Sequence, residues 1–124
     1  VDNGISIFMA KLLNSYTKYF NIKNDRVGSL FQGQFKAVHV DSDEQLLHLS
    51  RYIHLNPYVA ELTDNLNSYP WSSYLAYIGK ESNEFVSCDE VLAHFSSKKD
   101  YENFVLDQAD YGLTLDKIKH SQLD

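Results

Sequence analysis

The spacing of apolar residues predicts a long amphipathic helix followed by a strand near the start of the chain. Residues 4–20 carry apolar side chains three or four positions apart, with lysines on the opposite side; the apolar set is Ile5, Phe8, Leu12, Tyr16 and Tyr19. Such spacing places side chains on one face of a helix. Residues 29–40 instead alternate two sets of side chains, a strand pattern interrupted at Gly33, where a bulge or bend is expected.

A second amphipathic helix is predicted between the strand and Pro57. It begins at Asp41 or Ser42, either of which is a good N-cap, and it ends near Asn56 because proline disfavours the helical conformation of the residue before it. Its core face carries Leu46, Leu49 and Ile53. A polar stripe along the edge of that face, where side chains can line a cleft, consists of His48, Tyr52 and Asn56.

Several short helices are predicted in the rest of the chain. The first covers about residues 72–78 and is ended by Gly79. A capping box that starts at Ser87 opens the next one, and residues 98–109 form a further amphipathic helix. One or two more turns and a frayed tail are expected in residues 114–124.

This order of elements predicts an α+β fold that lacks part of its sheet. One strand region between two helices cannot form a stable sheet by itself. The missing strands are expected to come from preceding sequence or from a second copy of the chain. The chain also starts at Val1 without an initiator methionine, so we expect a fragment of a longer protein.

Charge and cysteine content limit the partners and the compartment. The net charge is −6, which argues against a simple electrostatic binder of nucleic acid. Residues 1–57 hold six basic and five acidic residues, whereas residues 58–124 hold five basic and twelve acidic residues. The first part of the chain can therefore still bind phosphate. Cys88 is the single cysteine, which fits a reducing, cytoplasmic compartment. No apolar run approaches the roughly 20 residues that span a bilayer, so no membrane partner is expected.

Among the side chains that could carry chemistry, one tyrosine differs from the others. The histidines have no metal-ligand spacing, and most tyrosines are expected to pack with their hydroxyl groups at the surface; these are Tyr16, Tyr19, Tyr69, Tyr74, Tyr77 and Tyr101. Tyr52 follows Arg51 and precedes Asn56 by one helical turn. A tyrosine nucleophile needs an exposed hydroxyl and a cation or metal on the phosphate oxygens. By spacing alone this signal is weak.

Three stretches together resemble a known family. They are "GSLFQGQFKA", "LSRYIHLNP" and "WSSYLAYIG", within residues 4–79. In order and spacing they are similar to the single-tyrosine HUH transposases, in the branch associated with repetitive extragenic palindromes. The resemblance implies a ferredoxin-like α+β sandwich that forms a homodimer and acts on single-stranded or hairpin DNA. It divides the chain into part of a transposase-like catalytic domain, residues 1–79, and an acidic helical extension, residues 80–124.

The resemblance also implies roles for individual residues. Tyr52 matches the nucleophile that forms a 5′-phosphotyrosine link to single-stranded DNA. Asn56 matches an assisting ligand of Mg²⁺ or Mn²⁺, and His54 is left as a bystander on the far side of the helix. By residue type and location, the expected phosphate contacts are Lys11, Lys18, Lys36 and Arg51.

Two departures from the family pattern keep alternatives open. The family's principal metal ligands, a His-hydrophobic-His pair, do not occur in this chain, so we expect the chain alone to be inactive in nicking. Gln34 stands where the family usually has arginine, and "NPYVAEL" replaces "NPVRAGL". The alternatives are a non-catalytic or decayed relative that binds DNA hairpins, and a helical protein-interaction domain based on the acidic residues 80–124.

Overall fold

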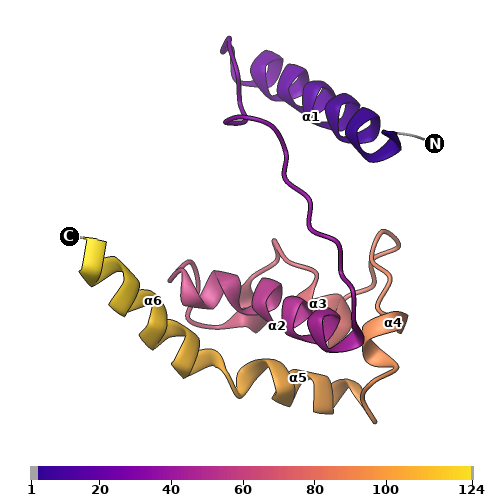
Figure 1. Ribbon diagram of the computed structural model, residues 1–124, viewed down its shortest axis with the longest axis vertical. Helices are drawn as coiled ribbons and strands as arrows, with labels where there is room; N and C mark the ends of the chain where they lie inside the picture. Colours follow the sequence, from indigo (N-terminus) through magenta and orange to yellow (C-terminus); the bar gives the residue numbers. More distant parts are fainter. Residues whose placement is uncertain (1–2, 124) are drawn as a thin grey trace. The chain divides into compact units, whose positions relative to one another are not determined.

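The computed structural model describes the backbone of residues 3–123, and the side chains of these residues except 119, 120, 122 and 123. The described residues form helices and irregular segments, with no strand among them. The helices, shown in Figure 1, are α1 (Gly4–Lys23), α2 (Asp43–Val59), the 3-10 turn η1 (Leu66–Ser68), α3 (Tyr74–Tyr77), α4 (Asp89–Leu92), α5 (Lys98–Leu106) and α6 (Ala109–Leu123). The α+β, ferredoxin-like class predicted from the sequence is therefore wrong for this structure.

The predicted strand at residues 29–40 is an irregular segment. Its alternating pattern is present, but backbone groups of a strand must pair with another strand, and the described residues provide none. Gly28 and Gly33 have φ values of +96° and +73°, which interrupt any extended conformation in the first half of the segment. Without a partner strand, the pattern alone does not produce a sheet.

The chain divides into two compact units, residues 1–39 and residues 40–124. This division differs from the 1–79 and 80–124 segments, which were defined by the resemblance and stay a prediction. Within the described residues, no helix is both long and apolar enough to cross a membrane.

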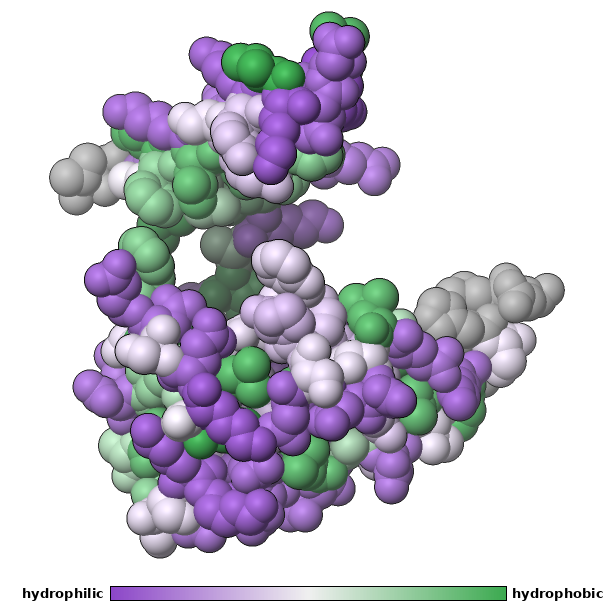
Figure 2. Space-filling view, turned by 180° about the vertical axis from the view of Figure 1, so that it is seen from behind, coloured by the Kyte–Doolittle hydropathy of each residue, from purple (hydrophilic) through white to green (hydrophobic). Residues whose placement is uncertain are grey.

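The first unit consists of α1 and a loop that folds back on the end of this helix. Asn21, in the last turn of α1, holds the loop: its amide nitrogen donates to the carbonyl of Gly28 at 3.0 Å, and its amide oxygen accepts from Arg26 at 2.8 Å. No residue of α1 is buried in the structure. The apolar stripe predicted from the spacing lies on this helix and is exposed, and hydrophobic side chains lie side by side along this unit in Figure 2; the stripe consists of Ile5, Phe8, Leu12, Tyr16 and Tyr19.

The second unit is built around α2. The helices α5 and α6 follow α2 along its length, and η1 and α4 also pack against it (Figure 1). The buried apolar residues come from α2, η1, α3, α4 and α5; they are Leu55, Leu66, Tyr74, Val91, Tyr101 and Val105. Segments from residues 80–124 therefore complete the core around α2.

The N-terminal end of α2 agrees with the prediction and its C-terminal end does not. Ser42 is the N-cap and accepts a hydrogen bond from the backbone N–H of Gln45 at 3.1 Å. The helix continues through Pro57 to Val59, three residues beyond the predicted end. Pro57 is buried and lies in the last turn, where a missing backbone N–H costs one hydrogen bond, and core packing outweighs this cost.

The short helices of the second unit begin and end differently from the predictions. The predicted capping box at Ser87 is absent, since α4 begins after Cys88 and its N-cap side chain makes no hydrogen bond. The helix α5 does have a serine cap, because Ser97 accepts from the N–H of Asp100 at 3.1 Å. The helix α6 is much longer than the predicted one or two turns. Packing on α2 explains its length, because tertiary contacts stabilise helices of weak intrinsic propensity.

Candidate functional site

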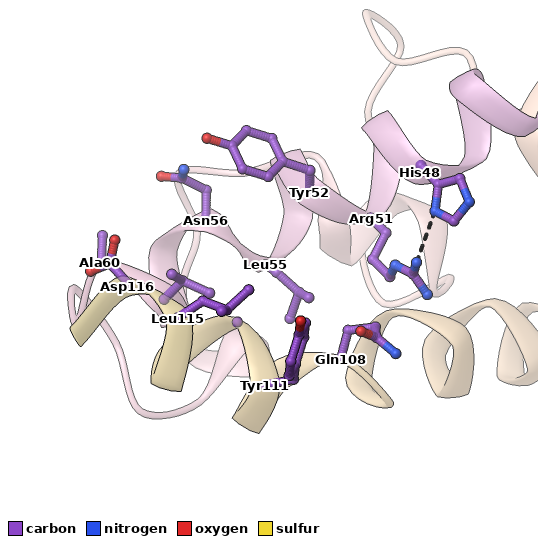
Figure 3. Close-up of a pocket in the computed structure, with 12 residues that line it drawn as sticks. His48, Arg51, Tyr52, Leu55, Asn56, Ala60, Gln108, Tyr111, Leu115 and Asp116 are labelled. Carbon is purple, nitrogen blue, oxygen red and sulfur yellow. Dashed lines mark hydrogen bonds between the residues drawn. The ribbon is translucent and has the colours of Figure 1, made fainter. Parts of the chain in front are cut away.

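The candidate site is an open groove between α2 and α6 in the second unit (Figure 3). Its volume is about 410 Å³, within the usual range of small-ligand pockets. The floor and walls are formed by His48, Arg51, Tyr52, Leu55, Asn56, Val59, Ala60, Gln108, Tyr111, Gly112, Leu115 and Asp116. All three members of the polar stripe predicted on α2 belong to this lining.

Helical spacing explains why Tyr52 and Asn56 lie together. Residues four apart are neighbours on a helix surface, and both side chains project from α2 in the same direction, away from α6, in Figure 3. Tyr52 is 66% exposed, whereas Leu55 points toward α6. Among the described residues, none forms a hydrogen bond to the Tyr52 hydroxyl. This hydroxyl is therefore accessible to a ligand.

Arg51 has structural contacts that the sequence did not predict. Its guanidinium lies 4.2 Å from the centre of the Phe104 ring, and Nη1 donates to the Phe104 carbonyl at 3.5 Å. The other terminal nitrogen donates to Nδ1 of His48 at 2.9 Å, the dashed line in Figure 3. The arginine thus joins α2 to α5, and its expected contact with DNA phosphate stays a prediction.

The predicted lysine contacts belong to the other unit. Lys11 and Lys18 are exposed on α1, and Lys36 is exposed in the irregular segment that follows. The structure therefore brings Tyr52, Asn56 and Arg51 together on one helix, and it does not assign the three lysines to the groove.

The groove does not contain the ligand set that the implied Mg²⁺ or Mn²⁺ site requires. His48 is its single histidine, and Nδ1 of this ring already accepts from Arg51. Within the described residues, no group of three or more His, Cys, Asp or Glu side chains is placed to hold a metal ion. Asn56 alone does not replace a histidine pair as a set of metal ligands.

A buried polar network on the opposite side of α2 was missed by the sequence interpretation. His54 is 2% exposed, and its Nδ1 and Nε2 lie 2.6 Å from the Tyr101 hydroxyl and 2.8 Å from the Ser73 hydroxyl. Burial lowers the pKa of His54 to about 4, so the ring is neutral near pH 7. His54 is therefore a core residue that joins α2 to α5 and to the turn before α3.

Both ring nitrogens of His54 have a hydroxyl partner, Tyr101 at Nδ1 and Ser73 at Nε2. A neutral imidazole has one donor nitrogen and one acceptor nitrogen, and a hydroxyl can serve either, so both hydroxyls satisfy the ring in each tautomer. Ser50, one turn before His54 on α2, donates to the Leu47 carbonyl at 2.8 Å.

Two tyrosines that were predicted to place their hydroxyl groups at the surface are buried instead. Tyr101 is fully buried and Tyr74 is 1% exposed. Burial raises the pKa of both, that of Tyr74 to about 12. The hydroxyl of Tyr74 has no hydrogen-bond partner among the described residues. Neither phenol is accessible for chemistry, in contrast to the exposed Tyr52.

The sequence contained one signal for this network. Leu47, Ser50 and His54 share a helix face by their spacing, so the two polar residues interrupt an otherwise buried stripe. Their partners Ser73 and Tyr101 lie 19 and 47 positions from His54, beyond any local pattern.

Comparison with known proteins adds no family to this geometry. No family model, no curated protein and no solved structure matches the chain. The transposase-like interpretation therefore rests on the three sequence stretches and on the groove beside Tyr52.

Proposed function

We propose that this chain is a transposase-like DNA-binding protein in which Tyr52 is the nucleophile toward single-stranded DNA. The observation that carries the proposal is the accessible Tyr52 hydroxyl on the wall of the groove, one helical turn from the Asn56 amide. The motif "LSRYIHLNP" around this tyrosine supports the same interpretation. Buried phenols such as Tyr101 cannot take this role because their hydroxyls are inside the core.

The proposed step is an in-line displacement at phosphorus. The Tyr52 oxygen attacks the phosphodiester and loses its proton to water, and a new O–P bond forms as the bond from phosphorus to the 3′ oxygen breaks. The 3′ oxygen takes a proton from water and leaves as a 3′-hydroxyl, while the 5′ side stays on the protein as a phosphotyrosine. The amide N–H of Asn56 is near enough along the helix to donate to a nonbridging phosphate oxygen.

A second candidate is a non-catalytic protein that binds hairpin DNA at the same groove. It is favoured by the lack of a metal-ligand group among the described residues and by the structural contacts that occupy Arg51. The two candidates share DNA binding and differ in covalent chemistry, so one experiment separates them.

The experiment offers the chain labelled single-stranded and hairpin oligonucleotides at low salt, with Mg²⁺ or Mn²⁺ added. Binding is followed by fluorescence anisotropy, and covalent adducts are resolved on denaturing gels. One series carries a 3′-bridging phosphorothiolate at each phosphodiester in turn. Its sulfur leaves readily without protonation and does not reverse the step, so even slow attack by tyrosine accumulates an adduct.

We expect binding and an adduct in the unmodified chain, and binding without an adduct in Tyr52→Phe. Tyr111→Phe is the matched control, because Tyr111 lines the same groove and is also exposed. It should keep the adduct. If the chain binds DNA but forms no adduct with any substrate, the enzymatic proposal is rejected and the non-catalytic hairpin-binding protein is supported. An adduct that survives Tyr52→Phe would overturn the nucleophile, and no retention of DNA at low salt would overturn both candidates.

A further inference from the structure

The groove has an exposed aromatic ring on each of its two helices. Tyr52 on α2 is 66% exposed and Tyr111 on α6 is 62% exposed, although both line the same cavity. Leu55 points from α2 toward α6 between them in Figure 3. The apolar floor is completed by Val59 and Leu115. A flat ligand can therefore lie on an apolar surface beside an aromatic face.

Each tyrosine has a carboxamide next to it. Asn56 lies beside Tyr52 on α2, and Gln108 lies beside Tyr111 on α6, as Figure 3 shows. A carboxamide offers both hydrogen-bond donors and an acceptor. The Gln108 carboxamide can form hydrogen bonds with the polar edge of a planar ring that stacks on Tyr111, whereas Tyr52 and Asn56 project away from α6.

Close packing of the two helices holds this groove in shape. A Cβ atom at Gly112 would lie 3.0 Å from a methyl group of Val59, so the glycine permits the close approach of α6 to α2. The Tyr58 hydroxyl donates to Asp110 at 3.4 Å across the same contact, and Lys117 pairs with Glu61 at 3.4 Å. The two walls therefore belong to one packed unit.

We infer that the groove binds an unpaired nucleobase of single-stranded DNA, with Tyr111 as its stacking residue and the Gln108 carboxamide at its edge. The inference rests on the proposed function and names the part of the DNA that the groove holds. Unpaired bases are bound by stacking on aromatic side chains together with hydrogen bonds to their edges. An aliphatic peptide side chain would fill the floor and use neither the Tyr111 ring nor the Gln108 amide.

This arrangement separates two roles within one groove. Tyr111 on α6 holds the base, while Tyr52 on α2 attacks a neighbouring phosphodiester. Residues 80–124 then contribute directly to substrate binding through α6, rather than forming an extension apart from the site.

The test compares Tyr111→Ala with Tyr111→Phe, which keeps the ring. Tyr111 is largely exposed, so neither change removes buried packing, and circular dichroism verifies the fold. The Ala variant should bind an unstructured oligonucleotide about tenfold to hundredfold more weakly, the usual effect of losing one base–aromatic stack. The Phe variant should bind within about threefold of the unmodified chain.

A second arm uses an oligonucleotide in which one nucleotide at a time is replaced by an abasic site. At one position the abasic site should weaken binding as much as Tyr111→Ala does, and the two changes together should cost no more than either alone. Equal DNA binding by the Ala variant and the unmodified chain would overturn the base pocket and leave the proposed function standing. An unmodified chain that does not bind DNA at all would instead remove the proposed function, and the base pocket with it.

Discussion

Acidification should destabilise the second unit through one buried histidine. His54 is neutral in the fold because burial lowers its pKa from 6.5 to about 4. The unfolded chain, in which the ring is in water, therefore binds more protons than the folded chain between these two values. The neutral His54 ring makes its full contribution to the free energy of unfolding above pH 6.5, and this contribution is lost as the pH falls toward 4.

The size of the effect follows from the two pKa values. Lowering the pH from 7 to 5 should reduce the free energy of unfolding by about 2 kcal/mol through His54 alone, and lowering it to 4 should reduce it by about 3 kcal/mol. A loss of this size is a large fraction of the 5–15 kcal/mol by which domains are usually stable.

The measurement is urea unfolding, followed by circular dichroism, at closely spaced pH values from 7 to 4. Carboxylates also titrate in this range, so the unmodified chain is compared with His54→Gln, which retains an amide for hydrogen bonding and does not titrate. His48→Gln removes an exposed histidine of the same helix and is the control. The difference in unfolding free energy between the unmodified chain and His54→Gln should shrink by about 2 kcal/mol from pH 7 to 5. Parallel curves for these two proteins, or a His54 ring that titrates near 6.5 by NMR in the folded chain, would refute the reasoning.

Three further substitutions test the packing of the second unit by urea unfolding. Tyr101→Phe should lower the unfolding free energy by about 1–3 kcal/mol, because it leaves the buried Nδ1 of His54 without its hydrogen-bond partner; an unchanged value would contradict the network. Tyr74→Phe is the same type of substitution with the opposite expected effect. It should raise the unfolding free energy by about 1 kcal/mol, since it removes a buried hydroxyl that has no hydrogen-bond partner among the described residues. A loss of stability would show that this hydroxyl is hydrogen-bonded. Gly112→Ala should lower the unfolding free energy by about 1 kcal/mol, because the new methyl group presses on Val59. In a Val59→Ala background the same change should stabilise by about 1 kcal/mol through helix propensity, and equal effects in both backgrounds would contradict the close contact.

The sequence by itself determined the features whose interactions are local. The apolar spacing in residues 4–20 predicted α1, and the two N-cap candidates Asp41 and Ser42 predicted the start of α2, because helical hydrogen bonds and caps join residues three or four apart. For the same reason the sequence placed Tyr52 and Asn56 side by side, and the structure shows both on the groove.

Only the tertiary structure decided the features whose partners are distant in the chain. The alternation in residues 29–40 could not become a strand, because a strand's hydrogen bonds must come from another segment and none is present among the described residues. Pro57 stays inside α2 because it is buried against the core, and α6 forms beyond its predicted length because it packs on α2. His54 was predicted as a bystander, yet its partners Ser73 and Tyr101 converge on it from other elements. Local sequence patterns specify which face of its own helix a residue occupies, but only tertiary packing determines which other elements contact that face.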